Sequence, residues 1–262
     1  MPETDLALLT AAAMKAGTLA RQFFGQDPHV IQKPDGAGPV TEADLQVDSL
    51  LRDTLCAARP AYGWLSEESP DTDARLGVTT QFIVDPIDGT RAFINGSKDW
   101  AHSLAIVEDG QVRAGVVYLP MHALLFTATV GGGAFLNGQP IRASGATSDA
   151  TLLATKPNFE PHWWKNGTPP DVTRAFRSSL AYRLSLVAQG RFDGMLTLRP
   201  CWEWDIAAGA LIVSEAGGKV SDQHDKPLRF NNPHPMVPGV VAAGHGLHGA
   251  LVSQLEPAAR AE

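Results

Sequence analysis

The spacing of the apolar residues changes twice along this 262-residue chain, and these changes limit the folds open to it. Within the first 60 residues, apolar side chains recur every three or four positions, as they do on one face of a helix. This spacing predicts a helix from Leu6 to about Phe24 and a second helix between Thr41 and Pro60. Between residues 62 and 130 the pattern changes to short apolar runs, and Glu108-Asp109-Gly110 separates two of them as a hairpin turn would. The sequence therefore predicts a helix pair followed by a mainly antiparallel sheet.

After about residue 150, apolar strands and helices alternate, which is typical of a layered α/β arrangement. The predicted elements are strands at 152–155, 195–198 and 240–243 and helices at 178–189, 206–216 and 247–255. We therefore expect a mixed α+β or α/β fold of two closely packed halves. Residues 1–145 would form an α+β half and residues 146–262 an α/β half.

Charge and cysteine content exclude several classes of function. The net charge is −7 and no run is rich in Lys or Arg, which argues against a nucleic-acid polymer or an anionic membrane as partner. A small anion remains compatible, because a few local groups can overcome net charge. Two cysteines, Cys56 and Cys201, are too few for a secreted disulfide framework. Since the first residues are also acidic and no apolar stretch reaches the ~18 residues of a membrane span, we expect a cytoplasmic protein with free thiols.

The most informative stretch runs from Phe82 to Thr90, where an apolar strand meets two aspartates, Asp85 and Asp88, and then a glycine. Asp, Pro and Gly all favour turns, so the segment taken alone fits a polar turn at the end of a strand. It also fits a magnesium site, because carboxylate and backbone carbonyl oxygens are the ligands that hard cations prefer. In that case the free N–H groups of Gly89 and Thr90, at the start of the next helix, would receive a phosphate.

Further acidic residues occur at the ends of other predicted elements. Glu67 and Glu68 follow a short strand, which by itself fits a solvated loop. Asp205 falls in the first turn of an alanine-rich helix, where an acid also favours the helix dipole. Asp44 stands three residues after Thr41, at the spacing of a helix capping box. Each position has an ordinary structural explanation, and only the combination is specific.

This combination resembles the inositol monophosphatase superfamily of magnesium-dependent, lithium-sensitive phosphatases. The matching motifs are Glu67-Glu68, Asp-Pro-Ile-Asp-Gly-Thr at 85–90 and Trp-Asp-Ile-Ala-Ala-Gly at 204–209, in the order of the family. The resemblance covers about residues 5–255 and implies a layered αβαβα sandwich, a phosphatase activity and a homodimer. A non-catalytic binding protein on the same fold is the alternative from a different class. The complete acidic set argues against it, since a decayed site need not keep every ligand.

The resemblance also implies a set of metal ligands. Glu67, Asp85 and the carbonyl of Ile87 would hold one Mg²⁺ ion, and Asp85, Asp88 and Asp205 a second. A third ion at Glu67 is left open. The charge argument agrees, because clustered carboxylates repel one another and stay ionised only around cations.

By the same resemblance, the catalytic residues are Asp44, Thr90 and Glu67. The Thr90 hydroxyl, paired with Asp44, would orient the attacking water and take its proton in a direct attack on a phosphate monoester. Lys33 matches a lysine of the inositol phosphatases and has the alternative of being an ordinary surface residue.

The nature of the substrate is less constrained. Inositol-selective members carry a glutamate in the strand before the Trp-Asp motif, where this chain has Leu196-Thr197-Leu198. Loss of a polar partner for a buried hydroxyl costs about 1–3 kcal/mol, which counts against inositol phosphate. Arg91-Ala92-Phe93-Ile94 is similar to the segment of the 3′(2′),5′-bisphosphate nucleotidases. The favoured substrate is therefore 3′-phosphoadenosine 5′-phosphate, with inositol 1-phosphate and histidinol phosphate as the alternatives.

The expected substrate contacts surround the predicted phosphate site: Asp88, Gly89, Thr90, Arg91, Ser179, Arg183 and Asp205. Arg91 and Arg183 would suit a second phosphate, because arginine binds phosphate through two N–H groups at once. Both also fit ordinary solvent-facing arginines. Trp202 and Glu203 depart from the family pattern beside the Trp-Asp motif, and we regard them as candidate specificity determinants.

Overall fold

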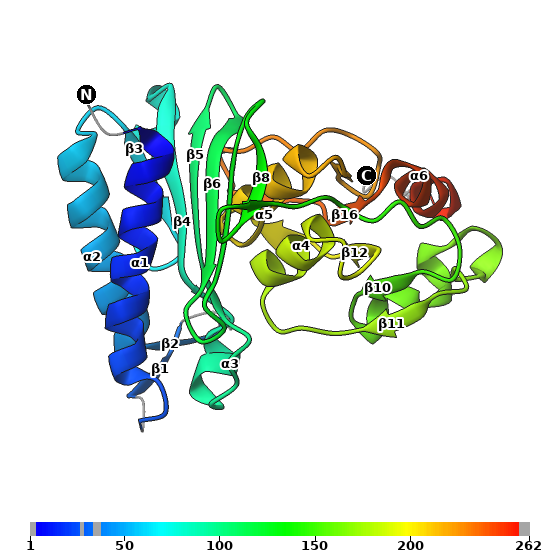
Figure 1. Cartoon of the computed structure of the whole chain (residues 1–262), viewed down its shortest axis with the longest axis horizontal. Coiled ribbons are helices and arrows are strands. Elements are labelled where there is room, and N and C mark those ends of the chain that lie inside the picture. Colours follow the sequence, from blue (N-terminus) through cyan, green and yellow to red (C-terminus); the bar gives the residue numbers. More distant parts are fainter. Residues whose placement is uncertain (1–3, 27–28, 34–37, 257–262) are drawn as a thin grey trace.

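Five layers of helix and sheet alternate across the protein (Figure 1), whose computed structural model describes residues 4–26, 29–33 and 38–256. The outer layer on one side is the pair α1 (Asp5–Phe23) and α2 (Glu42–Ala58), which covers a seven-stranded sheet. A central layer of α4 (Leu180–Ala188) and α5 (Glu203–Glu215) separates this sheet from a five-stranded one. Helix α6 (His245–Gln254) covers the far side. The predicted αβαβα sandwich is confirmed.

The first sheet is a meander with one parallel edge. Its strands, in spatial order, are β3 (Gly63–Ser66), β4 (Thr80–Asp88), β5 (Ala101–Glu108), β6 (Gln111–Leu119), β7 (Leu124–Thr129), β8 (Gly133–Leu136) and β9 (Gln139–Pro140). Only β3 and β4 run parallel, and the other neighbours are antiparallel. Helices cover both faces: Leu104 of β5 packs towards α1 and α2, and Ala105 packs towards the central layer. Burial on both faces explains why these strands read as continuous apolar runs.

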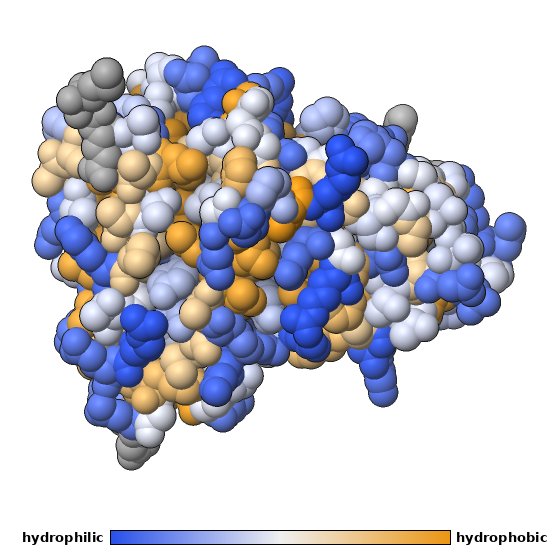
Figure 2. Space-filling view, in the orientation of Figure 1, coloured by the Kyte–Doolittle hydropathy of each residue, from blue (hydrophilic) through white to orange (hydrophobic). Residues whose placement is uncertain are grey.

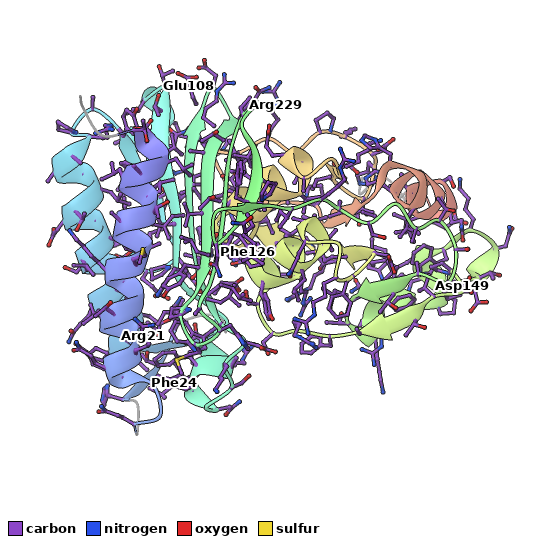
Figure 3. The ribbon with its side chains drawn as sticks, in the orientation of Figure 1. Arg21, Phe24, Glu108, Phe126, Asp149 and Arg229 are labelled. Carbon is purple, nitrogen blue, oxygen red and sulfur yellow. The ribbon has the colours of Figure 1, made fainter. Side chains whose placement is uncertain are left out.

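The second sheet mixes parallel and antiparallel strands. In spatial order it contains β11 (Thr173–Ala175), β10 (Thr151–Leu153), β12 (Gly194–Thr197), β16 (Val240–Ala243) and β14 (Lys219–Ser221). Leu196 and Val241 of this sheet pack with Leu247 and Leu251 of α6 in a separate apolar cluster. A larger apolar cluster lies between the two sheets, around α4 and α5. Phe126 of β7 in the first sheet belongs to it (Figure 3).

Short elements fill the connections. Two small antiparallel pairs are β1 (Val30–Gln32) with β2 (Pro39–Thr41), and β13 (Cys201–Trp202) with β15 (Met236–Val237). The remaining helices are α3 (Thr90–Ile94) and the 3₁₀ turns η2 (Asp73–Gly77), η3 (Lys156–Phe159), η4 (Pro161–Trp163) and η5 (Lys165–Gly167). Apart from α3, whose start at Thr90 was expected, the sequence patterns missed these pieces, because elements of two to five residues carry too little periodicity to detect.

The Ala-Ala-Gly part of the motif at 204–209 has a packing role. A Cβ atom on Gly209 of α5 would lie 2.7 Å from the Cβ of Leu184 on α4, so only glycine allows this helix contact. Helix α5 also begins three residues earlier than its predicted start at Ile206, with Trp202 at its N-cap and no side-chain cap. The N-cap position therefore lacks the Ser, Thr, Asp or Asn that marks a helix start in a sequence.

Two whole-chain features complete the description. Within the described ranges, every helix is too short or too polar to cross a membrane. Figure 2 shows hydrophilic residues over much of the face in view, with hydrophobic residues gathered mainly towards the middle. The predicted division of the chain near residue 145 stays a prediction.

Candidate active site

The ends of two parallel strands bring the first pair of carboxylates together. Ser66 of β3 is paired with Val84 of β4, so Glu67 and Asp85 follow at the same edge of the sheet. The backbone N–H of Glu67 donates to the carbonyl of Val84 at 3.2 Å, which extends the ladder by one residue. Parallel strands end at a common edge, and this places both acidic residues beside each other, as the sequence predicted.

An irregularity in β4 places Asp88 near Asp85. Residues three apart in a regular strand face opposite sides of the sheet. Here the pairing with β5 shifts between Asp85 and Asp88, and Pro86 falls within the shift. A bulge of this kind redirects side chains. Gly89 then takes φ of 104°, which a residue with a Cβ atom would adopt only with strain, and α3 begins at Thr90.

Helix α5 adds Asp205 to the cluster from the central layer. The carbonyl of Trp204 accepts a hydrogen bond of 2.8 Å from Ser103 Oγ on β5, which ties the first turn of α5 to the sheet. One carboxylate oxygen from each of Glu67, Asp85 and Asp205 lies within 4.8 Å of the other two. Residues from three separate segments thus converge on one point.

The charges of this cluster are poorly compensated. Asp85 is 1% exposed, and within the described residues neither of its carboxylate oxygens has a hydrogen-bond partner. Burial, together with repulsion from Glu67 and Asp88, raises the pKa of Asp85 well above its usual value. Burial and Asp88 do the same for Asp205. Unpaired buried carboxylates are costly, so this donor set fits a divalent cation with hard oxygen ligands such as Mg²⁺.

Lys33 supplies part of the missing positive charge. Its Nζ lies 2.8 Å from Glu67 Oε1 and 2.8 Å from Glu68 Oε1. Burial lowers the pKa of Lys33, but the two glutamates more than offset this and raise it overall. Burial and Glu67 still raise the pKa of Glu68 to about 7. One ammonium group is therefore too little for the acidic cluster, and Lys33 lies at the site rather than on an open surface.

Asp44 and Thr90 form the predicted pair. Thr90 Oγ1 donates to Asp44 Oδ1 at 3.2 Å and lies 3.3 Å from the carbonyl oxygen of Ile87, the backbone group expected at the metal. The other oxygen of Asp44 accepts the backbone N–H of Thr41 at 2.8 Å, which completes the capping box of α2. Burial raises the pKa of Asp44 to about 6. Asp44 therefore caps α2 and contacts Thr90 at the same time, and its catalytic role stays a prediction.

Asp88 faces the start of helix α4. Its Oδ2 accepts hydrogen bonds from Ser179 Oγ at 2.5 Å and from the backbone N–H of Ala181 at 2.7 Å. Burial raises the pKa of Asp88 to about 6, although these two donors act in the opposite direction. Ser179 is also the N-cap of α4. The structure thus places the predicted contact Ser179 against a site carboxylate.

The two predicted arginine contacts have different surroundings. Arg183 of α4 is 5% exposed, and its positive charge lowers the pKa of Asp88. Burial lowers the pKa of Arg183 to about 10, while Asp88 and Asp205 raise it. Arg91 is exposed and lines a surface hollow with Val30 and Pro39, and no hydrogen bond joins it to a described site residue. Arg183 therefore borders the cluster, whereas Arg91 faces the β1–β2 pair.

Glu203 has a structural role, and its interpretation as a specificity determinant stays a prediction. Its side chain is fully buried and accepts hydrogen bonds from the backbone N–H groups of Asn231 and Asn232 at 2.6 and 2.9 Å. Arg75 binds the same loop through Asn231 Oδ1 and the carbonyl of Asn232. The carboxylate of Glu203 is therefore used to hold a loop. A sequence pattern cannot show which way such a residue turns.

Trp202 remains beside the cluster. Its ring stacks on that of Trp204 with centroids 4.7 Å apart and planes 9° apart, and His234 packs edge-on at 5.4 Å. Trp202 is partly exposed and directly precedes the helix that carries Asp205. Its predicted role in specificity stays a prediction.

One buried residue behind the site was missed. His102 of β5 is fully buried, and its Nδ1 lies within hydrogen-bond distance of the carbonyl oxygen of Pro86, inside the segment between Asp85 and Asp88. Burial lowers the pKa of His102 to about 4, so the imidazole is neutral at pH 7. A histidine inside an otherwise apolar strand was the available signal.

Comparisons with known proteins agree with this geometry. Residues 1–259 match the model of the inositol monophosphatase family. An inositol-1-monophosphatase of Mesorhizobium japonicum is 35% identical over 92% of this chain and 91% of its own length. The Nus factor SuhB of Escherichia coli K12 has the same identity and coverage.

Solved structures give the same result. The extragenic suppressor protein SuhB of Bartonella henselae superposes with a TM-score of 0.79 at 30% identity, covering 94% of this chain and 96% of that one. An IMPase of Thermotoga maritima gives a TM-score of 0.80 at 28% identity, with 94% of both chains covered.

Proposed function

Because the chain belongs to the inositol monophosphatase family and is a magnesium-dependent phosphatase, we propose that it hydrolyses 3′-phosphoadenosine 5′-phosphate at the cluster of Glu67, Asp85 and Asp205. One observation carries the assignment of the site. The three carboxylates each place an oxygen within 4.8 Å of the others, and among the described residues no donor binds the carboxylate of Asp85. A cation bound there would compensate charges that the protein itself leaves unpaired.

In this proposal two magnesium ions, or three, would be held by Glu67, Asp85, Asp88, Asp205 and the carbonyl of Ile87. When bound, Mg²⁺ supplies the positive charge that polarises a phosphate and makes water a better nucleophile. The remaining steps belong to side chains of this chain.

Thr90 and Asp44 supply the proton acceptor. The Thr90 hydroxyl donates to Asp44 at 3.2 Å, so its oxygen lone pairs stay free to accept a proton from a water molecule. A carboxylate whose pKa is raised to about 6 is a competent acceptor near neutral pH. The pair thus orients water towards the phosphate and receives its proton.

The choice of substrate rests on two features, one at the end of strand β12 and one in helix α4. Leu196, Thr197 and Leu198 are all buried and offer no carboxylate for the hydroxyl groups of an inositol ring. Arg183 of α4 is a buried cation whose charge acts on Asp88, and it suits a second phosphate. Both features favour a bisphosphate over inositol phosphate.

Inositol 1-phosphate is the second candidate. The relatives at 35% identity include a protein named inositol-1-monophosphatase, and this similarity extends over nine-tenths of both chains. If this chain acts on inositol phosphate, a polar group outside the Leu196–Leu198 segment must replace the missing glutamate.

The test is phosphate release from three substrates side by side: 3′-phosphoadenosine 5′-phosphate, inositol 1-phosphate and histidinol phosphate. Each is measured with Mg²⁺, with Mg²⁺ and Li⁺, and with a chelator. We expect kcat/KM about 100-fold higher for the nucleotide, inhibition by Li⁺ and no release with the chelator. Arg183→Lys, which keeps the charge but loses the fork of donors, is expected to reduce this preference. A preference for inositol phosphate would overturn the choice of substrate.

A further inference from the structure

The buried guanidinium of Arg183 has few partners for its five N–H donors. Its Nε donates to the backbone carbonyl of Arg177 at 2.5 Å, and the described residues provide no acceptor for the other two nitrogens. The Cζ atom of Arg183 lies 4.6 Å from the centroid of the Phe176 ring, so this ring covers one face of the planar guanidinium. These two nitrogens are not among the buried polar atoms without a partner, so they reach solvent and are free to donate to an anionic group.

Phe176 is exposed to an unusual degree for a large aromatic residue. One side of its ring contacts Arg183, yet 47% of its surface is accessible. Phe176 directly follows β11 and lies three residues before Ser179. Ser179 is the N-cap residue of α4 that donates to Asp88. The exposed ring is therefore joined to the acidic cluster by a short segment and by the side chain of Arg183.

We propose that Phe176 and Arg183 form a subsite for a planar heteroaromatic ring of the substrate. The ring stacks on the exposed part of Phe176, and the free donors of Arg183 bind an anionic group beside it. Aromatic side chains favour such stacking with nucleobases whatever their hydrogen-bonding edges. The contact of Arg183 holds the Phe176 ring in place before the ligand arrives. This inference rests on the proposed function and adds to it the residues that receive the base of the substrate.

The test compares two ligands that differ only in the ring. Adenosine 5′-monophosphate carries a base and ribose 5-phosphate does not. Their Kd values are measured by calorimetry with Mg²⁺ present, for the wild type, Phe176→Ala, Phe176→Trp and Val130→Ala. Val130 is another exposed apolar residue, at 53%, and serves as the matched control.

The wild type and Val130→Ala are expected to bind the nucleotide about tenfold more tightly than ribose 5-phosphate. Phe176→Ala removes this difference and leaves the Kd of ribose 5-phosphate unchanged, whereas Phe176→Trp keeps the difference. Equal binding of both ligands by the wild type would overturn the proposal. So would an equal loss for both ligands in Phe176→Ala, since Phe176 would then only support Arg183. Failure of the proposed function has a separate signature in the release assay: either none of the three substrates releases phosphate, or inositol 1-phosphate is preferred.

Discussion

Single residues in this site carry two functions at once, and this limits what their sequence context reveals. Asp44 caps α2 and accepts a hydrogen bond from Thr90, and Asp88 binds the start of α4 while it adds charge to the acidic cluster. In contrast, the carboxylate of Glu203, next but one to Asp205, holds a loop. The acidic motifs predicted which residues meet. The direction of each neighbouring side chain depends on tertiary contacts that no local pattern contains.

The role of Thr90 can be isolated at this scale. Thr90→Val keeps the shape but lacks the hydroxyl, so kcat is expected to fall by about 100-fold or more, within the usual range for loss of a proton-transfer group. Thr90→Ser keeps the hydroxyl and should stay within a fewfold of the wild type. Steady-state kinetics give kcat, and the Mg²⁺-dependent rise in Tm serves as a check that the metal site is intact. Full activity in Thr90→Val would show that the Thr90–Asp44 pair is not the proton acceptor.

At the scale of elements, long periodic segments were predictable and the contacts between them were not. Helices α1 and α2 and the hairpin of β5 and β6 were predicted nearly at their observed bounds, because each has a strong apolar pattern or turn. The shift in β4 that turns Asp85 and Asp88 to the same site was not predictable. It depends on how β5 pairs with β4, a long-range property.

Two glycine substitutions test the packing of the helices. Gly209→Ala in α5 puts a methyl group 2.7 Å from Leu184, and such overpacking costs about 1–3 kcal/mol, more than the gain of up to about 1 kcal/mol in helix propensity. Gly249→Ala in α6 meets nothing within 4 Å and should stabilise the protein by up to about 1 kcal/mol. Urea unfolding measures both. A stabilised Gly209→Ala variant would mean that α4 and α5 are packed less closely than described.

At the scale of the whole molecule, buried ionisable groups make stability depend on pH in opposite directions. Burial lowers the pKa of His248 to about 4, and its Nε2 is 2.9 Å from Ser221 Oγ. The unfolded chain takes up this proton near pH 6.5 and the folded chain only near pH 4. His248 therefore makes the protein less stable as pH falls between these values. Asp44 and Asp88, with pKa values raised to about 6, have the opposite effect without metal.

The contribution of His248 is separable by substitution. When the pH falls from 7 to 4.5, the free energy of unfolding should decrease in both proteins, and by about 2 kcal/mol less in His248→Gln than in the wild type. The variant has no imidazole at this position to take up a proton on unfolding. His162→Gln, at an exposed site, should behave as the wild type. Urea unfolding at both pH values gives the comparison. Equal pH dependence in His248→Gln and the wild type would show that the imidazole is accessible to protons in the folded state.

The helical and strand patterns predicted a mixed α/β fold, and the five-layer arrangement came from the family resemblance that the three motifs carry. The substrate stays a proposal, because contacts such as that between Phe176 and Arg183 form only in the folded chain and no local pattern contains them. The predicted homodimer stays a prediction.

The central claim is that the cluster around Asp85 is the metal site, and magnesium binding tests it most directly. Binding to metal-stripped protein is measured by calorimetry for the wild type, Asp85→Asn and Asp109→Asn. Asp109 lies in an exposed turn with φ of 51°, which asparagine also adopts, so it is the matched control. The wild type and Asp109→Asn should bind Mg²⁺ at millimolar concentration or below. Asp85→Asn should bind at least tenfold more weakly and have a higher Tm without metal, because it loses a buried unpaired carboxylate. Undiminished Mg²⁺ binding by Asp85→Asn would contradict the assignment of this cluster as the metal site.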